Sequence, residues 1–213
     1  MTPYRPFIND PEHIGRLEGQ RYVVLRPCGI ISDVYAQLQT VFKEKLAGLP
    51  VSHPAQPHIT LAGFPKGTPL ESVRELVAQW APTISPLQVE IERVSFFPTP
   101  FQIVIAQVRK TTALFNALVT LRDWAKRRDL HDLMTTPPAD WTFHMSVAYC
   151  ALLSPSAWAD VTRFIETMDG PAAQCVVTEV EIVAFDSGHE YSGGTFDLSG
   201  HRAARFESGE SMI

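Results

Sequence analysis

Two short segments of the sequence repeat each other, and this repeat constrains the fold more than any other feature. His58-Ile59-Thr60 and His144-Met145-Ser146 both contain a histidine, an apolar residue and a hydroxyl residue, 86 positions apart. In an extended strand alternate side chains point to opposite faces. The histidine and the hydroxyl residue therefore share one face, while the apolar residue between them faces the core. Each copy predicts a strand with one reactive face.

The agreement between the two copies continues well beyond the tripeptides. Apolar residues meet apolar residues at the same offset in six further pairs: Leu61 and Val147, Ala62 and Ala148, Val89 and Cys175, Ile91 and Val177, Val94 and Val180, Phe96 and Ile182. Both copies also shift the phase of their apolar alternation at the same place, after the fourth of these pairs. A shared phase shift predicts a bulge or twist that is used twice.

A repeat of this length that occurs twice indicates two fused half-domains related by a pseudo-two-fold axis, not a solenoid. Such an axis would bring His58 and His144 face to face. The alternative is that each is an ordinary strand histidine, satisfied by neighbours in a half-buried sheet. A single motif would favour that alternative, whereas the matched pair favours a shared site.

The pair of H-x-[ST] motifs resembles the 2H phosphoesterase superfamily, which includes the 2′-5′ RNA ligase-like proteins and the cyclic nucleotide phosphodiesterases. The resemblance covers about residues 20–200. It implies four catalytic residues at matching positions: His58, Thr60, His144 and Ser146. It also places Tyr149 where several relatives carry an aromatic or basic residue near the substrate.

The resemblance further implies a substrate with a 2′,3′-cyclic phosphate or a 2′-5′ phosphodiester, on a small nucleotide or an RNA end. Relatives typically open the cyclic phosphate with water and leave a 2′-phosphate. Such cleavage needs a base, an acid and donors for the non-bridging oxygens, which two imidazoles and two hydroxyls supply. Taking His144 as the base and His58 as the acid is an arbitrary choice at this stage.

Two aromatic residues near the motifs are candidates for binding the nucleobase. Tyr149, and with it Phe64, is predicted to form an aromatic wall, because a π face stacks on any base. Simple packing within the sheet is the alternative for both residues.

Other kinds of site find little support in the sequence. There is no Gly-rich phosphate loop and no nucleophile elbow, so neither ATP-driven ligation nor a cofactor is expected. The histidines have no nearby cysteine or carboxylate cluster, so no metal site is expected. Cys28, Cys150 and Cys175 are spaced as reduced, packed residues, not as disulfides or zinc ligands.

The formal net charge of −5 argues against a protein that coats long nucleic acid. The basic groups Arg109-Lys110 and Lys126-Arg127-Arg128 are interpreted as solvated ends of a strand and a helix. No apolar stretch is long enough for a membrane span or a signal core. We therefore expect a cytoplasmic monomer without membrane contact.

The periodicity predicts an α+β fold of two pseudo-symmetric lobes, each a mainly antiparallel sheet with helices packed outside, and a central cleft between the lobes. Strands are expected at 21–26, 58–62, 87–97, 101–108, 142–150, 174–185 and 195–198, and helices at 33–46, 70–80, 112–128 and 156–168. Ser32 is the predicted cap of the first helix, and 186–194 a hairpin loop. The whole chain, 1–213, is expected to be one domain with an irregular lead-in at 1–19 and a mobile tail at 201–213.

Two other functions compete with hydrolysis of a phosphodiester. In the first, the same cleft holds a nucleotide or RNA end without turning it over, as a non-catalytic binding module. In the second, Ser146 and a histidine form an acyl hydrolase. The second carries less weight, because the order and spacing of the residues provide no elbow and no third member of a triad.

Overall fold

The computed structural model describes residues 15, 17–170, 172–187 and 189–200. Most of the predicted lead-in and all of the predicted tail from residue 201 lie outside the described residues. The elements are β1 (Arg21–Leu25), α2 (Ile30–Lys45), β2 (Ile59–Phe64), α3 (Leu70–Trp80), η1 (Ala81–Thr83), β3 (Leu87–Phe97), β4 (Ile103–Val108), α4 (Thr112–Lys126), η2 (Pro138–Asp140), β5 (His144–Tyr149), α5 (Pro155–Glu166), β6 (Ala173–Val177), β7 (Glu179–Asp186) and β8 (His189–Asp197).

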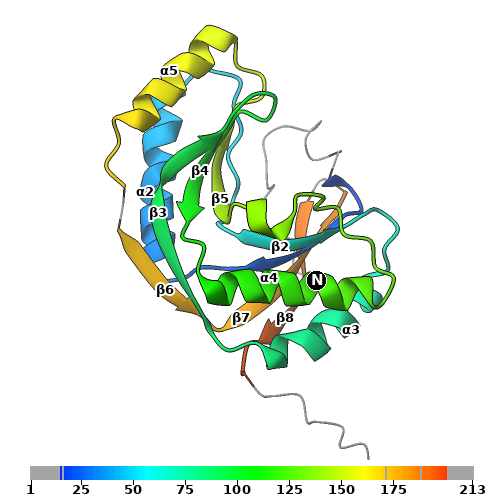
Figure 1. Ribbon diagram of the computed structural model, residues 1–213. Coiled ribbons are helices and arrows are strands. Elements are labelled where there is room, and N and C mark those ends of the chain that lie inside the picture. The colour runs from blue at the N-terminus through cyan, green and yellow to red at the C-terminus, as the bar shows by residue number, and fades with distance from the viewer. Residues whose placement is uncertain (1–14, 16, 171, 188, 201–213) are drawn as a thin grey trace, which may run out of the picture.

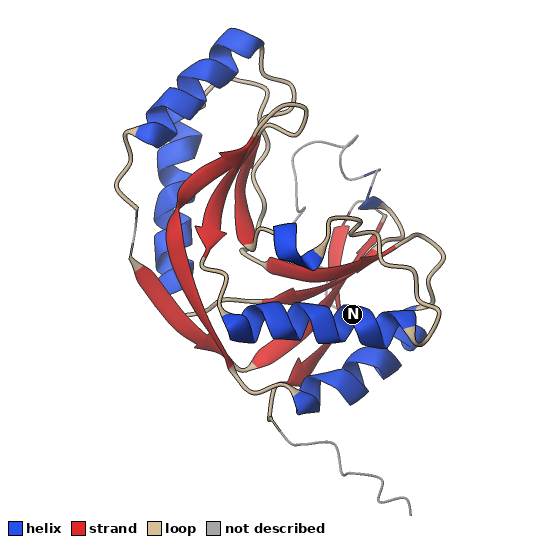
Figure 2. Ribbon diagram, in the orientation of Figure 1, coloured by secondary structure: helices blue, strands red, loops and turns tan. Residues whose placement is uncertain are grey.

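These strands form two antiparallel sheets of four strands each. The first sheet has the order β2-β1-β7-β8 and the second the order β5-β4-β3-β6. Helices α3 and α4 pack against the first sheet, and α2 and α5 pack against the second (Figures 1 and 2). The predicted α+β fold with two lobes, antiparallel sheets and outer helices is confirmed.

The two copies of the repeat exchange parts with each other. Strands β1 and β2 of the first copy correspond to β4 and β5 of the second, and β3 corresponds to β6 and β7 together. All of β3 lies in the second sheet, whereas β7 joins the first. Helices α2 and α4 likewise pack on the sheet of the other copy. The two sequence copies therefore cannot separate without breaking backbone hydrogen bonds within a sheet.

The predicted phase shift has a different form in each copy. In β3 the register shifts between Ile91 and Arg93, which makes Glu92 the extra residue of a bulge. The equivalent residue of the second copy, Thr178, is the break between β6 and β7. The same phase shift is thus produced by a bulge in one copy and by a break between two strands in the other.

Two details of the predicted secondary structure are wrong. Ser32 does not cap α2, because the helix begins at Ile30 after Gly29, and the Ser32 hydroxyl instead donates to the carbonyl oxygen of Pro27 at 3.0 Å. The predicted hairpin loop at 186–194 is mostly strand β8. Its glycine and polar residues are typical of a loop, but Glu190 is buried by an ion pair to Arg26, a residue far away in the sequence.

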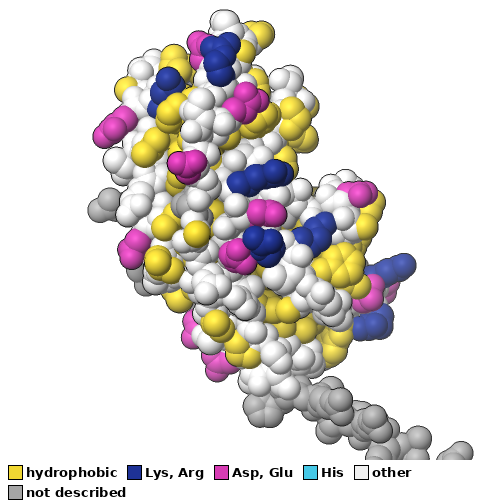
Figure 3. Space-filling model, turned by 60° about the vertical axis from the view of Figure 1, so that its left-hand side comes forward, with side chains coloured by type: hydrophobic (Ala, Val, Ile, Leu, Met, Phe, Trp, Pro, Cys, Tyr) yellow, Lys and Arg dark blue, Asp and Glu magenta, His cyan; other side chains and the backbone are white. Residues whose placement is uncertain are grey.

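The surface carries mixed charges. On the face shown in Figure 3, basic and acidic side chains alternate without forming a basic stripe. At the end of α4, Arg127 and Arg128 lie over the ring of Trp124, at 5.7 and 4.9 Å from its centroid. Both arginines therefore pack on a residue of the helix that they follow. Among the described residues, no helix is both long and apolar enough to cross a membrane.

Candidate active site

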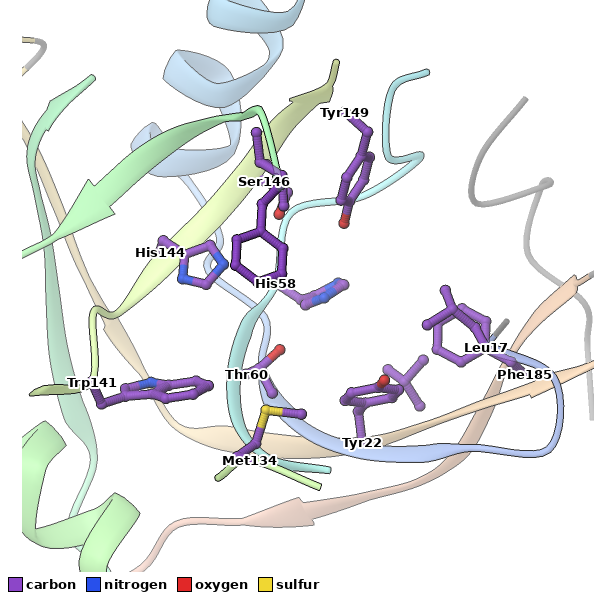
Figure 4. A pocket seen from close by; sticks show the side chains of 13 residues that line it. Leu17, Tyr22, His58, Thr60, Met134, Trp141, His144, Ser146, Tyr149 and Phe185 are labelled. Carbon is purple, nitrogen blue, oxygen red and sulfur yellow. The ribbon is translucent and has the colours of Figure 1, made fainter. Parts of the chain in front are cut away.

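The two motifs meet in one cavity of about 400 Å³, lined by strands of both sheets. His58 and Thr60 reach it from the start of β2, and His144 and Ser146 from β5. Ile59 and Met145, the apolar residues between them, are fully buried in the core. The alternation predicted for each motif strand is therefore present, and Figure 4 shows the four polar side chains directed into the same space.

Of the two predicted aromatic residues, only Tyr149 lines this cavity. Phe64 is wholly buried in the hydrophobic core and is not a lining residue. A bulge is the reason. In the pairing of β1 with β2, Val23 lies opposite Ala62 and Val24 opposite Thr60, so Leu61 is an extra residue. Beyond it the alternation is shifted, and Gly63 faces the cavity while Phe64 faces the core.

The second motif strand contains the same bulge at the equivalent residue, Val147. Val104 lies opposite Ala148 and Ile105 opposite Ser146. Because of this extra residue, Tyr149 returns to the face that already carries His144 and Ser146. Strict alternation would have buried its side chain.

Gly63 is the counterpart of Tyr149 in the first copy, and other side chains fill the space that its own would occupy. A Cβ atom on Gly63 would lie 2.7 Å from Cε of Met134 and 3.0 Å from Cε1 of Tyr22. Both of these side chains line the cavity. The site is thus built on a symmetric backbone but has an asymmetric lining.

The sequence analysis missed most of the cavity wall. Eight further residues line it: Leu17, Tyr22, Phe101, Ile103, Met134, Trp141, Val183 and Phe185. Of these eight, only Trp141 could have been predicted from the sequence. It lies three residues before the second motif, and aromatic residues beside a motif strand are candidates for ligand contact. The others come from strands and loops that gave no sign of facing the site.

His144 has one ring nitrogen engaged by the backbone. Its Nδ1 lies 2.8 Å from the carbonyl oxygen of Thr142, which can only accept, so Nδ1 carries the hydrogen. The neutral ring then has its lone pair on Nε2. Burial lowers the pKa of His144, and the Thr142 carbonyl opposes that shift because it stabilises the charged ring.

His58 is the more strongly perturbed histidine. Burial lowers its pKa to about 3, and the charges of Arg26 and His144 act in the same direction. Arg26 forms ion pairs with Glu181, at 2.7 Å, and with Glu190, and it donates from Nη1 to the carbonyl oxygen of Pro57 at 3.3 Å. The guanidinium group thus fixes the backbone just before His58 while it disfavours a charged imidazole there.

Two tyrosines complete the polar lining. Burial raises the pKa of Tyr22 and of Tyr149 to about 12, and each therefore keeps its hydroxyl proton at neutral pH. Tyr149 is also hydrogen bonded to Ser146, and the carbonyl oxygen of Ser146 accepts from Tyr35 at 2.7 Å. The backbone of the second motif is thus held from behind by α2.

Each motif strand is also held by a loop that precedes the other motif. Ser52 and Tyr149 exchange both backbone hydrogen bonds, at 3.1 and 2.8 Å, which ties the loop before β2 to β5. In the other direction the amide of Leu133, in the loop before β5, donates to the carbonyl oxygen of Gly63 at 2.7 Å. These reciprocal contacts fix the two histidines relative to each other.

The arrangement places two neutral imidazoles, two aliphatic hydroxyls and two phenols around a mostly apolar cavity. Such a set can donate and accept protons and can bind an anionic oxygen by hydrogen bonds. In the part of the chain that the structure describes, no three His, Cys, Asp or Glu side chains are grouped so that they could hold a metal ion.

A comparison with models of known protein families assigns the chain to a family. The family model described as the 2′-5′ RNA ligase superfamily matches residues 37–189, which include both motifs. The chain belongs to the 2′-5′ RNA ligase superfamily. This membership confirms the resemblance seen in the two H-x-[ST] motifs. No curated protein matches the sequence.

Solved structures share the fold of this superfamily member at low identity. TT0787 of Thermus thermophilus has a TM-score of 0.60 at 16% identity, over 85% of this chain and 99% of its own. The apo form of E. coli LigT has a TM-score of 0.59 at 13% identity, over 85% and 98%. LigT complexed with NADP+ has a TM-score of 0.56 at 14% identity, over 85% and 99%.

Proposed function

We propose that this protein is a phosphoesterase that hydrolyses a 2′,3′-cyclic phosphate or a 2′-5′ phosphodiester of a nucleotide or RNA end. One observation carries the proposal: His58 with Thr60 and His144 with Ser146, from different sheets, line a single cavity. A phosphoryl group between the two motifs would have an imidazole on each flank and a hydroxyl beside each imidazole. This is the set of groups that phosphodiester hydrolysis needs.

The electrostatics favour His58 as the base and His144 as the acid. Burial and Arg26 keep His58 neutral, so its ring is in the unprotonated form that a general base requires near neutral pH. The carbonyl oxygen of Thr142 stabilises a charged His144, and a bound phosphate anion would stabilise it further. This assignment is the reverse of the arbitrary one made from the sequence.

The proposed reaction on a cyclic phosphate is a single displacement at phosphorus. Water attacks the phosphorus atom and His58 takes the proton that the water loses. The bond from phosphorus to the ribose 3′ oxygen breaks. His144, which is protonated on both ring nitrogens when the phosphate anion is bound, gives its Nε2 proton to that oxygen and becomes neutral. The product is a 2′-phosphate with a free 3′ hydroxyl.

The remaining polar groups bind the substrate in this scheme. The hydroxyls of Thr60 and Ser146 donate to the non-bridging oxygens, which fixes the phosphoryl group and offsets its charge in the transition state. Tyr149 forms part of the wall beside the leaving ribose. The two imidazoles carry out both proton transfers, so the scheme calls for no metal ion or cofactor.

The fold supports a nucleotide as the class of ligand. E. coli LigT, which shares this fold, has been solved in complexes with 3′-AMP, with NADP+ and with ATP. For this chain a small nucleotide or an RNA terminus is accordingly the proposed substrate, in a cavity of a size suited to one small molecule.

The proposal is tested by incubating the protein with nucleoside 2′,3′-cyclic phosphates and 2′-5′ dinucleotides in the presence of a chelator. We expect turnover that survives the chelator and is lost in His58→Ala and in His144→Ala, while His189→Ala, outside the cavity, keeps it. Tight binding without turnover would instead identify a binding module. Turnover that the chelator abolishes would overturn the metal-independent mechanism.

A further inference from the structure

Trp141 lines the cavity but has no part in the chemistry proposed above. It lies between η2 and β5, three residues before His144, and its indole is half-buried. In Figure 4 it lies on the same side of the cavity as His144, with Thr60 and Met134 beyond it. A large aromatic surface thus borders the space next to the acid.

One face of this indole is already occupied from the protein side. Arg122, from α4, lies over the ring with its Cζ atom 4.9 Å from the centroid. The guanidinium group also donates to the carbonyl oxygen of Thr136 at 2.8 Å. Because Arg122 covers one face, the surface that Trp141 offers to the cavity is the remaining one, and the cation behind it holds the ring by a cation–π contact.

Asp132 ties the segment 130–141, which carries Trp141, to the first motif strand. One carboxylate oxygen accepts from the amides of Gly63, at 3.2 Å, and Met134, at 2.9 Å. The other forms an ion pair with Nε of Arg122 at 3.0 Å. Asp132 therefore joins three parts of the site: strand β2, which follows His58, the cavity wall at Met134, and Arg122, the cation behind Trp141.

The position of the phosphoryl group determines what Trp141 can contact. If the two motifs hold the phosphoryl group, the rest of the nucleotide must lie against the other walls, which are mainly apolar and aromatic. A flat aromatic surface stacks on a nucleobase whatever the base is. Fixing that surface in advance reduces the entropy lost when the ligand binds.

We propose that Trp141 is the platform on which the nucleobase of the substrate stacks, and that Arg122 and Asp132 are positioning residues that hold it in place. The proposal rests on the proposed function for the placement of the phosphoryl group. It goes beyond that function because it assigns base recognition to a segment outside both motifs.

The first test compares substrates with and without a base. Trp141→Leu and Trp141→Phe are assayed on a nucleoside 2′,3′-cyclic phosphate and on methyl riboside 2′,3′-cyclic phosphate, which has no base. For the nucleoside substrate we expect Trp141→Leu to raise KM between roughly fivefold and a hundredfold with little change in kcat, and Trp141→Phe to restore much of the loss. The base-free substrate should respond to neither variant. An equal change in KM for both substrates, or no change for either, would contradict the proposal that the base stacks on Trp141.

The second test asks whether Arg122 and Asp132 act through Trp141. Asp132→Asn and Arg122→Gln should raise KM for the nucleoside substrate, with Arg122→Lys in between, and should have little further effect once Trp141 is Leu. Arg109→Gln, in an exposed ion pair with Glu90, is the matched control and should behave as wild type. If Asp132→Asn raises KM as much in the Trp141→Leu background as in wild type, the positioning role is refuted.

A binding measurement separates failure of the platform from failure of the proposed function. Quenching of indole fluorescence is measured with a nucleoside 3′-monophosphate and with ribose 3-phosphate, in wild type and in Trp141→Phe. We expect quenching by the nucleotide alone, and only where Trp141 is present. This result would support the platform even if no phosphodiester were turned over. Equal quenching in the two proteins would overturn it, whether or not the protein is an enzyme.

Discussion

Val89 and Cys175 occupy the same position in the two copies of the repeat, and they lie directly opposite each other in the pairing of β3 with β6. On either side, Leu87 lies opposite Val177 and Ile91 opposite Ala173. A residue that pairs with its own equivalent marks the place where the pseudo-two-fold axis crosses the sheet. The pairing of β3 with β6 thus fixes how the two copies, and with them the two motifs, lie relative to each other. These two strands are far from either histidine in the sequence.

If the two histidines act as a pair, their substitutions should not be additive. We expect His58→Ala and His144→Ala each to lower kcat by roughly two to four orders of magnitude, with the double variant little worse than either single one. The reason is that one displacement needs both the base and the acid. Steady-state rates over a range of pH should give a bell-shaped curve for wild type. Two independent, multiplying losses would contradict the paired mechanism.

The low pKa of His58 predicts a dependence of stability on pH. Below about pH 6.5 the unfolded chain takes up a proton on this residue that the folded protein does not, down to about pH 3. The free energy of unfolding should therefore fall as the pH falls through this window, by up to about 1.4 kcal/mol per pH unit. Above the window the residue is neutral in both states and contributes nothing.

Urea unfolding at several pH values tests this prediction. His58→Gln keeps a neutral polar side chain and removes the titration, so its stability should decline less steeply than that of wild type between about pH 6 and pH 4. His189→Gln, outside the cavity, serves as the control. Parallel curves for wild type and His58→Gln would show that the folded protein accepts a proton on His58 as readily as the unfolded chain.

The sequence predicted the parts of the fold that depend on local alternation and on the repeat. Both motif strands, α3 and the two-lobed architecture follow from apolar periodicity and from the matched pairs of residues. The bulges at Leu61 and Val147 were not visible, because each is followed by an alanine and both residues of the pair are buried. The predicted strand ended at residue 62, which left Phe64 free to form an aromatic wall, whereas β2 continues to Phe64 and the bulge turns this side chain into the core.

The walls of the site depend on contacts between distant residues, which a single sequence does not reveal. Trp141 and Tyr22 face the cavity because loops and strands from separate regions meet there. Strand β8 is another example, since the buried carboxylate of Glu190 is paired with Arg26, 164 positions earlier in the chain. Local propensity gives no indication of such a contact.

Tyr149 provides a test of the wall beside the leaving ribose. Tyr149→Ala should raise KM for a nucleotide substrate, because it removes an aromatic wall and opens the cavity. Tyr149→Phe should change KM less, since it keeps the ring and loses only the hydroxyl that is hydrogen bonded to Ser146. Michaelis constants for the two variants are the measurement. An unaltered KM in Tyr149→Ala would remove this residue from the substrate site.

A methyl group on Gly63 is expected to force the side chain of Met134 aside. It would meet Cε of Met134 at 2.7 Å and Cε1 of Tyr22 at 3.0 Å, and because Cε is the end of a flexible side chain, Gly63→Ala should destabilise the protein by only about 1 kcal/mol. Shortening the neighbour relieves the clash, and Gly63→Ala should therefore cost much less in a Met134→Ala background. Urea unfolding of the four proteins gives the coupling. Strictly additive losses would mean that Met134 moves away freely.

Arg26 is expected to contribute more to stability than any exposed ion pair. Its partners Glu181 and Glu190 are almost fully buried, at 5% and 1% exposure. Arg26→Met would leave two buried carboxylates without their cation, at a cost of about 3–5 kcal/mol, because removing one partner of a buried ion pair leaves an uncompensated charge. Arg109→Met, which breaks an exposed pair with Glu90, should change the free energy of unfolding much less.

The same variants report on the link between this cluster and the catalytic histidine. Without the Arg26 charge, the pKa of His58 should rise toward its ordinary value, because one of the charges that disfavour the imidazolium is gone and two carboxylates remain nearby. The NMR titration of the His58 ring should show that rise in Arg26→Met and no change in Arg109→Met. If His58 titrated identically in all three proteins, Arg26 would serve only to neutralise the carboxylates and to hold Pro57, and burial rather than the Arg26 charge would account for the low pKa of His58.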